Sequence, residues 1–498
     1  MQQHFYPSKF TGLLMLLGTM FAAQSQAVPP RSLEKMDSLM SLTRTSTAIN
    51  PRIDSLEMVG VGLSLETWRN HPDHPLLNIW TAVENSKGSY IIAQEPKQYP
   101  KNLEELRMAS SKRNGDAVEA AMRDFMDCYP LPLAVIGPAW HGPDEEEPRS
   151  VQRTANARSF VTTKRTDPYT APGEFGGLLT QSGQVMNSYL NDEPDLLWQT
   201  VFATFEAHGD IPAVGVAAKD GVIQRAAGEY KRDRALFDKL AEPAYRPKQA
   251  RVFSDNWTFI TLVRRGRIDA LRTYAPMVED TMTVKNFGGQ GPSRNRSQFA
   301  GWKKTPSQPF IATPYMAAPW TSFQIAQYDH LENLGTLFRP QVVTYLDDQG
   351  KAVNAAERTA RMDAAVRAAL APLGGKMPAR VLYDYGSVWD DRTSATRFLP
   401  LVQSLHAVDP DFDLLDPKHG YDLARILGDT GAGGPFVAVA LASMAGRQSG
   451  GATLVANLRR NDGATLLLVT PPTAEQVKRD ASIKRPFYPD TANVKDTF

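Results

Sequence analysis

Short apolar runs of strand length alternate with segments of helical spacing along most of this chain, and this alternation limits the fold more than any other feature. Residues 56–63 have the apolar density and length of a buried strand. Residues 75–85 follow, with apolar side chains at helical spacing. Such alternation is typical of an α/β protein in which helices flank a sheet, and it argues against a sandwich or a helical bundle.

The same pattern recurs through the N-terminal half. We expect further strands at residues 90–93, 131–136 and 213–218. We expect helices at residues 102–111, 116–126 and 193–207. The last of these helices places Leu197, Val201 and Phe205 on one face, which predicts that this face is buried.

A second series of strands and helices begins in the C-terminal half. We expect strands at residues 257–263, 341–346, 379–383, 452–458 and 464–469, and helices at 355–371 and 436–445. The last two strands are joined through Asn461, Asp462 and Gly463, which tolerate the positive φ of a tight hairpin turn. Residues 288–319 are rich in Gly, Pro, Ser and Asn, so we expect a long irregular excursion there.

The domain organisation follows from length and from one charged, proline-containing segment at residues 225–248. A chain of 498 residues is long enough for two domains and a leader. We therefore predict an α/β protein made of two α/β domains with mixed sheets flanked by helices. The expected divisions are a signal peptide or N-terminal anchor at 1–27, a linker at 28–51, domains at 52–235 and 250–485, and a tail at 486–498.

The N-terminal segment predicts export. Lys9 precedes residues 10–23, which carry no charge. This run is too short to cross a hydrocarbon core, which takes about 20 residues, but it suits the apolar region of a secretory signal. The run Ser25, Gln26 and Ala27 follows, with small side chains at its first and last positions, as in the cleavage site of a signal peptidase. We expect a periplasmic protein, or an inner-membrane-tethered one if the leader is not cleaved, with a cytoplasmic location as the alternative.

Charge and cysteine content exclude several classes of function. The chain has 55 basic and 54 acidic side chains, so its formal charge is +1 and it lacks a global attraction for nucleic acid or for anionic lipid. We expect no nucleic-acid partner and no membrane contact beyond an N-terminal anchor. One cysteine, Cys128, excludes an intramolecular disulfide and any site built from several thiolates.

Sequence motifs for catalysis are absent. No Gly-x-Ser-x-Gly pentapeptide occurs, and Ser182 lacks the preceding glycine that a strained nucleophile turn requires. No His-Glu-x-x-His occurs, and His71 and His74 fall in a proline-containing turn. Two further segments are better explained as loops. Residues 409–416 lack the glycine and glutamate that complete a calcium loop, and residues 428–434 match neither phosphate-binding fingerprint and suit a turn between helices. We predict no catalytic, metal or cofactor residues, and no enzyme.

A segment that mixes aromatic and basic side chains is the best candidate for contact with another protein. Aromatic residues and arginine are the types most enriched at the energetic centres of protein interfaces. The candidate partner-binding residues are Arg264, Arg265, Arg267, Trp302, Lys303, Lys304, Phe310, Tyr315 and Trp320.

Four strings in the C-terminal half carry a resemblance to a known family. They are residues 261–272, 299–304, 324–329 and 420–431. Together they resemble the type VI lipase adapter family, and the similarity extends from about residue 56 to about residue 472. The resemblance implies a non-catalytic adapter or chaperone. Such a protein binds a phospholipase effector and brings it to the spike protein of a type VI secretion system.

Two other functions stay open at this point. One is a hydrolase whose active site is not recognisable in sequence, in which His406, Asp384 and Ser404 converge only in three dimensions. The other is a periplasmic ligand-binding protein with a cleft between two lobes. A deep pocket lined by titratable groups would favour the first, and closure on a ligand would favour the second.

The leader gives a direct test. Protein isolated from its native cells should begin at Val28, because cleavage is expected after Ala27. N-terminal peptide mass spectrometry measures this. A mature protein that retains residues 1–27 would contradict the cleavage.

Overall fold

The computed structural model describes residues 52–66, 68–69, 77–92, 133–138, 160–165, 184–189, 194–221, 254–285, 294–313, 316, 318–386 and 391–482, with single positions between 105 and 121. Several sequence predictions lie outside these ranges: the leader, the linker, the tail, Cys128, the turn with His71 and His74, Ser182 and the segment 225–248. No helix among the described residues is long and apolar enough to cross a bilayer.

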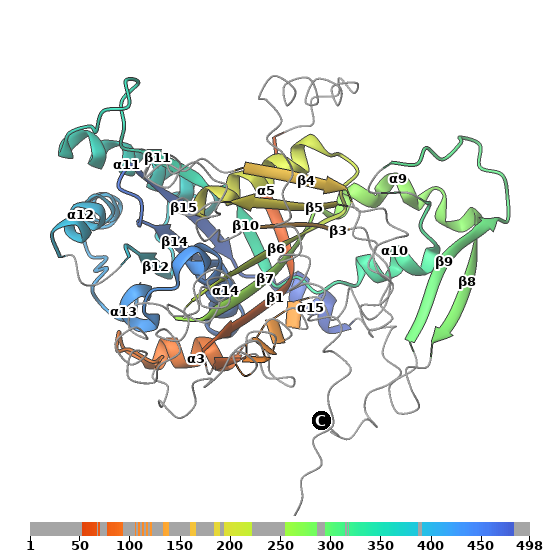
Figure 1. Cartoon of the computed structure of the whole chain (residues 1–498), viewed down its shortest axis with the longest axis horizontal. Coiled ribbons are helices and arrows are strands. Elements are labelled where there is room, and N and C mark those ends of the chain that lie inside the picture. The colour runs from red at the N-terminus through yellow and green to blue at the C-terminus, as the bar shows by residue number, and fades with distance from the viewer. Residues whose placement is uncertain are drawn as a thin grey trace, which may run out of the picture.

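The described strands form one 13-stranded mixed sheet and a separate two-stranded ribbon (Figure 1). The strands of the large sheet are β1 (Ser55–Leu65), β2 (Trp68–Arg69), β3 (Leu133–Pro138), β4 (Phe160–Arg165), β5 (Gln184–Tyr189), β6 (Ala213–Asp220), β7 (Asn256–Val263), β10 (Gly335–Phe338), β11 (Gln341–Thr344), β12 (Arg380–Asp384), β13 (Gly420–Asp422), β14 (Thr453–Asn457) and β15 (Gly463–Thr470). Their order in space is β13-β12-β14-β15-β10-β1-β7-β6-β3-β5-β4, with β11 beside β15 and β2 beside β1.

Strand β1 joins the two halves of the chain. It pairs antiparallel with β7 on one side and with β10 on the other, where Met58 lies opposite Gly335. Strands from both sides of the expected domain boundary therefore belong to one sheet. The predicted class, α/β with a mixed sheet flanked by helices, is confirmed. The positions of the domain boundaries stay a prediction.

Helices cover this sheet on both faces. They are α3 (Leu77–Asn85), α5 (Leu197–Ala207), α11 (Ala355–Leu370), α12 (Asp391–Val408), α13 (Leu423–Leu427) and α14 (Gly434–Ser449). Helix α14 is buried on all sides from Gly434 to Gly446, as expected of a helix without a polar face. It packs on β1, β7, β10, β12, β14 and β15.

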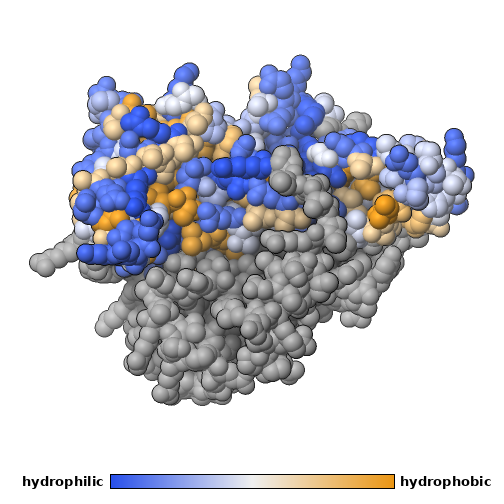
Figure 2. Space-filling model, turned by 90° about the horizontal axis from the view of Figure 1, so that it is seen from above, coloured by the Kyte–Doolittle hydropathy of each residue, from blue (hydrophilic) through white to orange (hydrophobic). Residues whose placement is uncertain are grey.

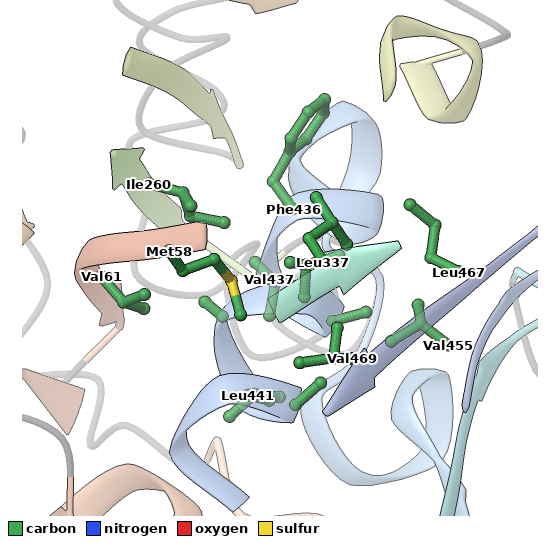
Figure 3. Packing of buried hydrophobic residues seen from close by; sticks show 14 of the residues in the cluster. Met58, Val61, Ile260, Leu337, Phe436, Val437, Leu441, Val455, Leu467 and Val469 are labelled. Carbon is green, nitrogen blue, oxygen red and sulfur yellow. The ribbon is translucent and has the colours of Figure 1, made fainter. Parts of the chain in front are cut away.

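The main core lies between α14 and the middle of the sheet. In Figure 3, Phe436, Val437 and Leu441 of α14 lie among side chains of β1, β7, β10, β14 and β15. A second core lies on the other face, where Met362 of α11 and Leu401 of α12 belong to one cluster with strand residues. Since successive strand residues point to opposite faces, neighbouring side chains of one strand enter different cores.

Two glycines allow the close approach of a helical segment to β1. A Cβ atom on Gly62 would lie 1.7 Å from the carbonyl oxygen of Ala117, and one on Gly60 would lie 1.8 Å from that of Ala121. The hydroxyl of Thr261, on the neighbouring strand β7, donates to the same Ala121 carbonyl at 3.2 Å. The segment therefore touches the sheet backbone to backbone, which only residues without a Cβ permit.

Three sequence predictions need correction. Residues 90–92 do not form a strand, although the Ile91 N–H donates to the Ile426 carbonyl at 3.0 Å. The hairpin between β14 and β15 is present, but Asn461, Asp462 and Gly463 adopt no positive φ, because the connection is longer than a two-residue turn. The third concerns residues 288–319, where a regular strand occupies part of the expected irregular excursion.

Two loop interpretations are confirmed in outline. Gly428 ends α13 at φ 77°, and α14 begins at Gly434, so residues 428–434 connect two helices. The acidic residues Asp409, Asp413 and Asp416 each accept a backbone N–H two residues further on. The helix after them begins at Leu423, with Asp422 as its N-cap, rather than near Gly420.

The close approach at β1 predicts a severe effect of one methyl group. Gly62→Ala should lower the free energy of unfolding by about 3 kcal/mol or prevent folding, because the strand or the helical segment must move. Gly301→Ala is the matched control, since its Cβ would meet nothing closer than 3.8 Å. Urea denaturation followed by circular dichroism measures both variants. Equal midpoints for Gly62→Ala and the unchanged protein would contradict the packing.

Candidate partner-binding surface

The two-stranded ribbon and its flanking segments form a unit beside the large sheet, at the right of Figure 1. After β7 the chain forms η5 (Arg265–Ile268), α9 (Asp269–Arg272) and η6 (Ala275–Met277). Strands β8 (Val278–Lys285) and β9 (Arg294–Trp302) then pair antiparallel, and the chain continues to α10 (Ser322–Asp329). This unit holds most of the candidate partner-binding residues.

Arginine side chains fix the C-terminal end of α10. Arg265 forms an ion pair with Glu57 of β1 at 2.8 Å. Its guanidinium group also donates to the carbonyls of Tyr328, Asp329 and Leu331 at 2.7–3.2 Å. Arg272 of α9 makes two hydrogen bonds of 2.6 Å to the carboxylate of Asp329. Helix α10 is thereby attached both to the large sheet and to α9.

The N-terminal end of α10 is attached to β9. Thr321 is its N-cap and forms a capping box with Gln324. The Thr321 hydroxyl also hydrogen-bonds with the hydroxyl of Ser297, which in turn donates to Asp280 of β8 at 2.5 Å. Because both ends of α10 are held, the ribbon and the residues before the helix keep a defined arrangement.

A bulge in the ribbon brings two aromatic rings together. Phe299 and Trp302 are three residues apart, so a regular strand would point them to opposite faces. The pairing shifts here: Glu279 lies opposite Gly301 and Asp280 opposite Phe299, which leaves Ala300 as the extra residue of a β-bulge. As a result, the two rings meet edge to face, with centroids 5.3 Å apart and an interplanar angle of 71°.

These rings line a surface hollow of about 640 Å³, which we call the aromatic hollow. It is formed by Phe299, Trp302, Thr305, Pro306, Pro309, Phe310, Ala318 and Pro319. Tyr274 supports it: its ring contacts Phe310 edge to face at 5.5 Å and Trp302 at 6.1 Å, and its hydroxyl donates to the Pro309 carbonyl at 3.4 Å. The wall therefore consists almost entirely of aromatic rings and proline rings.

Cationic and apolar side chains are exposed beside the aromatic hollow. Trp302 is 36% exposed and Ile311 is 79% exposed. Lys303 and Lys304 follow Trp302 directly and are exposed, while the Lys303 N–H donates to the Met277 carbonyl at 2.9 Å. Figure 2 shows hydrophobic residues among hydrophilic ones at the end of the molecule that carries the ribbon. Such a surface offers apolar contact and positive charge together.

The structure divides the candidate partner-binding residues into two groups. Trp302, Lys303, Lys304 and Phe310 lie together at the surface. Trp320 does not: it is 3% exposed and packs against Tyr328, with ring centroids 5.7 Å apart. It is a core residue of the unit, because its ring packs on a buried tyrosine of α10.

The side chains of two of the three arginines hold the unit in place. Arg265 forms the ion pair with Glu57 and the hydrogen bonds to carbonyls at the C-terminal end of α10. The Arg267 guanidinium donates to the Phe205 carbonyl, and burial lowers its pKa from the ordinary value. Arg264 is half-buried, and its carbonyl accepts from the Tyr328 hydroxyl at 3.3 Å. Tyr315 lies outside the described residues.

Sequence reasoning missed several side chains of the hollow. Phe299, Pro306, Pro309 and Pro319 were part of a segment expected to be irregular, and Tyr274 was not among the candidate residues. The one available signal was the density of proline and aromatic residues between 299 and 320. The bulge at Ala300 leaves no recognisable trace in the sequence.

The residues considered for a hidden hydrolase site show no hydrogen bond to one another in the described part of the chain. Asp384 accepts from Arg459 at 2.8 Å and from the Gly386 N–H at 2.8 Å. Ser404 is buried on α12, whereas His406, two residues later, is exposed on another face of that helix. Within the described ranges, no group of three or more His, Cys, Asp or Glu side chains is arranged to hold a metal ion.

Comparison with solved structures finds ketosynthases and 3-oxoacyl-(acyl carrier protein) synthases, among others. One is a type II polyketide synthase acyl-carrier protein in complex with its ketosynthase, which is 12% identical, covers 84% of this chain and 100% of that chain, and has a TM-score of 0.42. Another is 3-oxoacyl-(acyl carrier protein) synthase III from Pseudomonas aeruginosa, at 12% identity, 84% and 99% coverage and a TM-score of 0.34. Overlap at this level carries no conclusion about function.

Family models give a sharper result. Residues 54–239 match the model described as the N-terminal part of type VI lipase adapter protein Tla3, and residues 334–471 match the model of its C-terminal part. The two matched segments make up more than half of the 498 residues, and the resemblance found in the sequence is confirmed. The chain belongs to the type VI lipase adapter protein Tla3 family.

Proposed function

We propose that this protein is a non-catalytic adapter that binds a phospholipase effector of a type VI secretion system and helps deliver it to the spike protein. Membership of the lipase adapter family supports the binding of a lipase. The surface that we assign to this binding is the aromatic hollow with Lys303 and Lys304 beside it. The observation that carries the assignment is a partly exposed tryptophan at a hollow lined by rings that other rings hold in place.

The physical argument is one of interface energetics. A few aromatic side chains in desolvated pockets carry most of the binding energy of a typical interface. Trp302 and Phe310 are held by Phe299 and Tyr274, so a partner orders few additional side chains when it binds. The neighbouring lysines accelerate association with a partner surface of opposite charge.

The position of this surface supports a role in choosing the partner. The aromatic hollow is formed by residues 299–319, between the matched segments 54–239 and 334–471. We propose that the matched segments supply the shared scaffold, and that the ribbon unit between them selects the effector.

We also propose that the leader exports the protein to the periplasm or tethers it to the inner membrane. Effector binding would then take place on the periplasmic side. The apolar run at residues 10–23 supports this location.

Affinity capture from native cells tests the binding surface. Tagged full-length protein should recover a lipase effector, and Trp302→Ala with Phe310→Ala should lower that recovery at least about tenfold, because loss of two interface anchors costs well over 1.4 kcal/mol. Quantitative mass spectrometry measures the recovered effector.

Leu415→Ala is the matched control, since Leu415 is an exposed apolar residue (73%) far along the chain from the ribbon unit. Trp320 is left unchanged, because replacing this buried side chain would disturb the unit itself. If the variant with Trp302→Ala and Phe310→Ala folds and recovers as much effector as the Leu415→Ala control, the aromatic hollow is not the binding surface. Recovery of no lipase by the unchanged protein would refute the proposed function as well.

A further inference from the structure

We infer that the aromatic hollow binds an extended, proline-containing segment of the partner that carries acidic residues at one end. This inference rests on the proposed function and specifies what the effector, or a segment attached to it, presents to the adapter. It follows from the chemistry of the wall, the rigidity of the rings and the distribution of charge around the hollow.

The chemistry of the wall favours proline. Phe299, Trp302 and Phe310 contribute rings, and Pro306 and Pro309 add apolar surface. Grooves lined with aromatic side chains recognise polyproline II segments, whose rings pack on the aromatic faces. Such segments are already extended before binding, so they lose little conformational entropy.

The hollow is preorganised for such a ligand. Tyr274 contacts both Phe310 and Trp302, and its hydroxyl bonds to the Pro309 carbonyl. Ser297 connects β9 with Thr321 at the start of α10. A wall fixed from both sides need not be ordered when a ligand binds, which lowers the entropic cost of association.

The exposed charges next to the hollow are mainly positive. Lys303 and Lys304 are exposed directly after Trp302. On strand β8, Glu279 is exposed and lies opposite Gly301, while the Asp280 carboxylate accepts a hydrogen bond from the Ser297 hydroxyl. The two lysines are adjacent at the end of β9, so acidic residues are expected at the end of the bound segment that lies nearest to them and not along its whole length.

Other occupants fit the surface less well. A membrane would be met by Trp302, Ile311 and the lysines, but the rings of the wall line a hollow, which suits the insertion of a segment better than contact with a bilayer surface. A second copy of the chain and the chain's own residues 483–498, which include Pro486 and Pro489, are further alternatives. The experiment below separates each of these from a partner segment.

Fluorescence anisotropy with three labelled peptides tests the inference on the full-length protein. The first peptide has six prolines followed by four glutamates; the second has lysines in place of the glutamates; the third has alanines in place of the prolines. We expect the first to bind at least tenfold more tightly than either of the others. Lys303→Glu with Lys304→Glu should reverse the preference between the first two, and Trp302→Ala should abolish binding.

Four outcomes would overturn the inference. The first is that the three peptides bind with equal affinity, or that none binds up to 1 mM. The second is that the protein binds vesicles containing phosphatidylglycerol through Trp302 but binds no peptide, and the third is that it forms a Trp302-dependent dimer that excludes the peptide. The fourth is that truncation after Ser482 makes the peptide bind tenfold more tightly, which would assign the hollow to the chain's own tail. If Trp302-dependent effector capture persists while the first peptide fails to bind, the inference fails and the proposed function stands.

Discussion

Pairing of β1 with both β7 and β10 is the interaction on which the rest of this structure depends. It places an N-terminal strand in the middle of a sheet whose other members come from both halves of the chain. Because Gly60 and Gly62 have no Cβ atom, the helical segment with Ala117 and Ala121 can pack directly on the backbone of this strand. The same strand reaches the ribbon unit, because Glu57 pairs with Arg265 and accepts from Asn333 at 3.0 Å. Strand β1 thus contacts both the scaffold and the unit that carries the proposed binding surface.

Arginine and lysine have different tasks in the ribbon unit, and the difference follows from their chemistry. Arg265 contacts one carboxylate and three carbonyls at once, which a planar group with five N–H donors can do and an ammonium group cannot. Lys303 and Lys304 lie in solvent, where a strongly hydrated charge costs nothing and attracts an acidic partner over a distance. The basic composition of this segment therefore combines internal support with an outward charge.

Much of the fold could be predicted because buried elements leave a pattern in the sequence. The apolar runs at β1, β6 and β7 and the unbroken apolar face of α14 each indicated their element. The partner of each strand could not be predicted, since an apolar run fits any neighbour in a sheet, and the sequence gives no sign that strands of both halves pair with β1. In the candidate site, Trp302 and Trp320 could not be distinguished from the sequence. Trp320 is buried because it packs on Tyr328 of α10, whereas Trp302 is partly exposed. Phe299 was missed because its orientation depends on the bulge at Ala300.

We propose that the ribbon unit, and not the face of the large sheet, meets the partner. Hydrogen–deuterium exchange of the full-length protein with and without its captured lipase effector tests this claim most directly. Exchange is expected to slow in peptides that cover residues 297–313, while peptides of α11 and α12 keep their exchange rates. Slowed exchange in α11 and α12 with no change at residues 297–313 would contradict it.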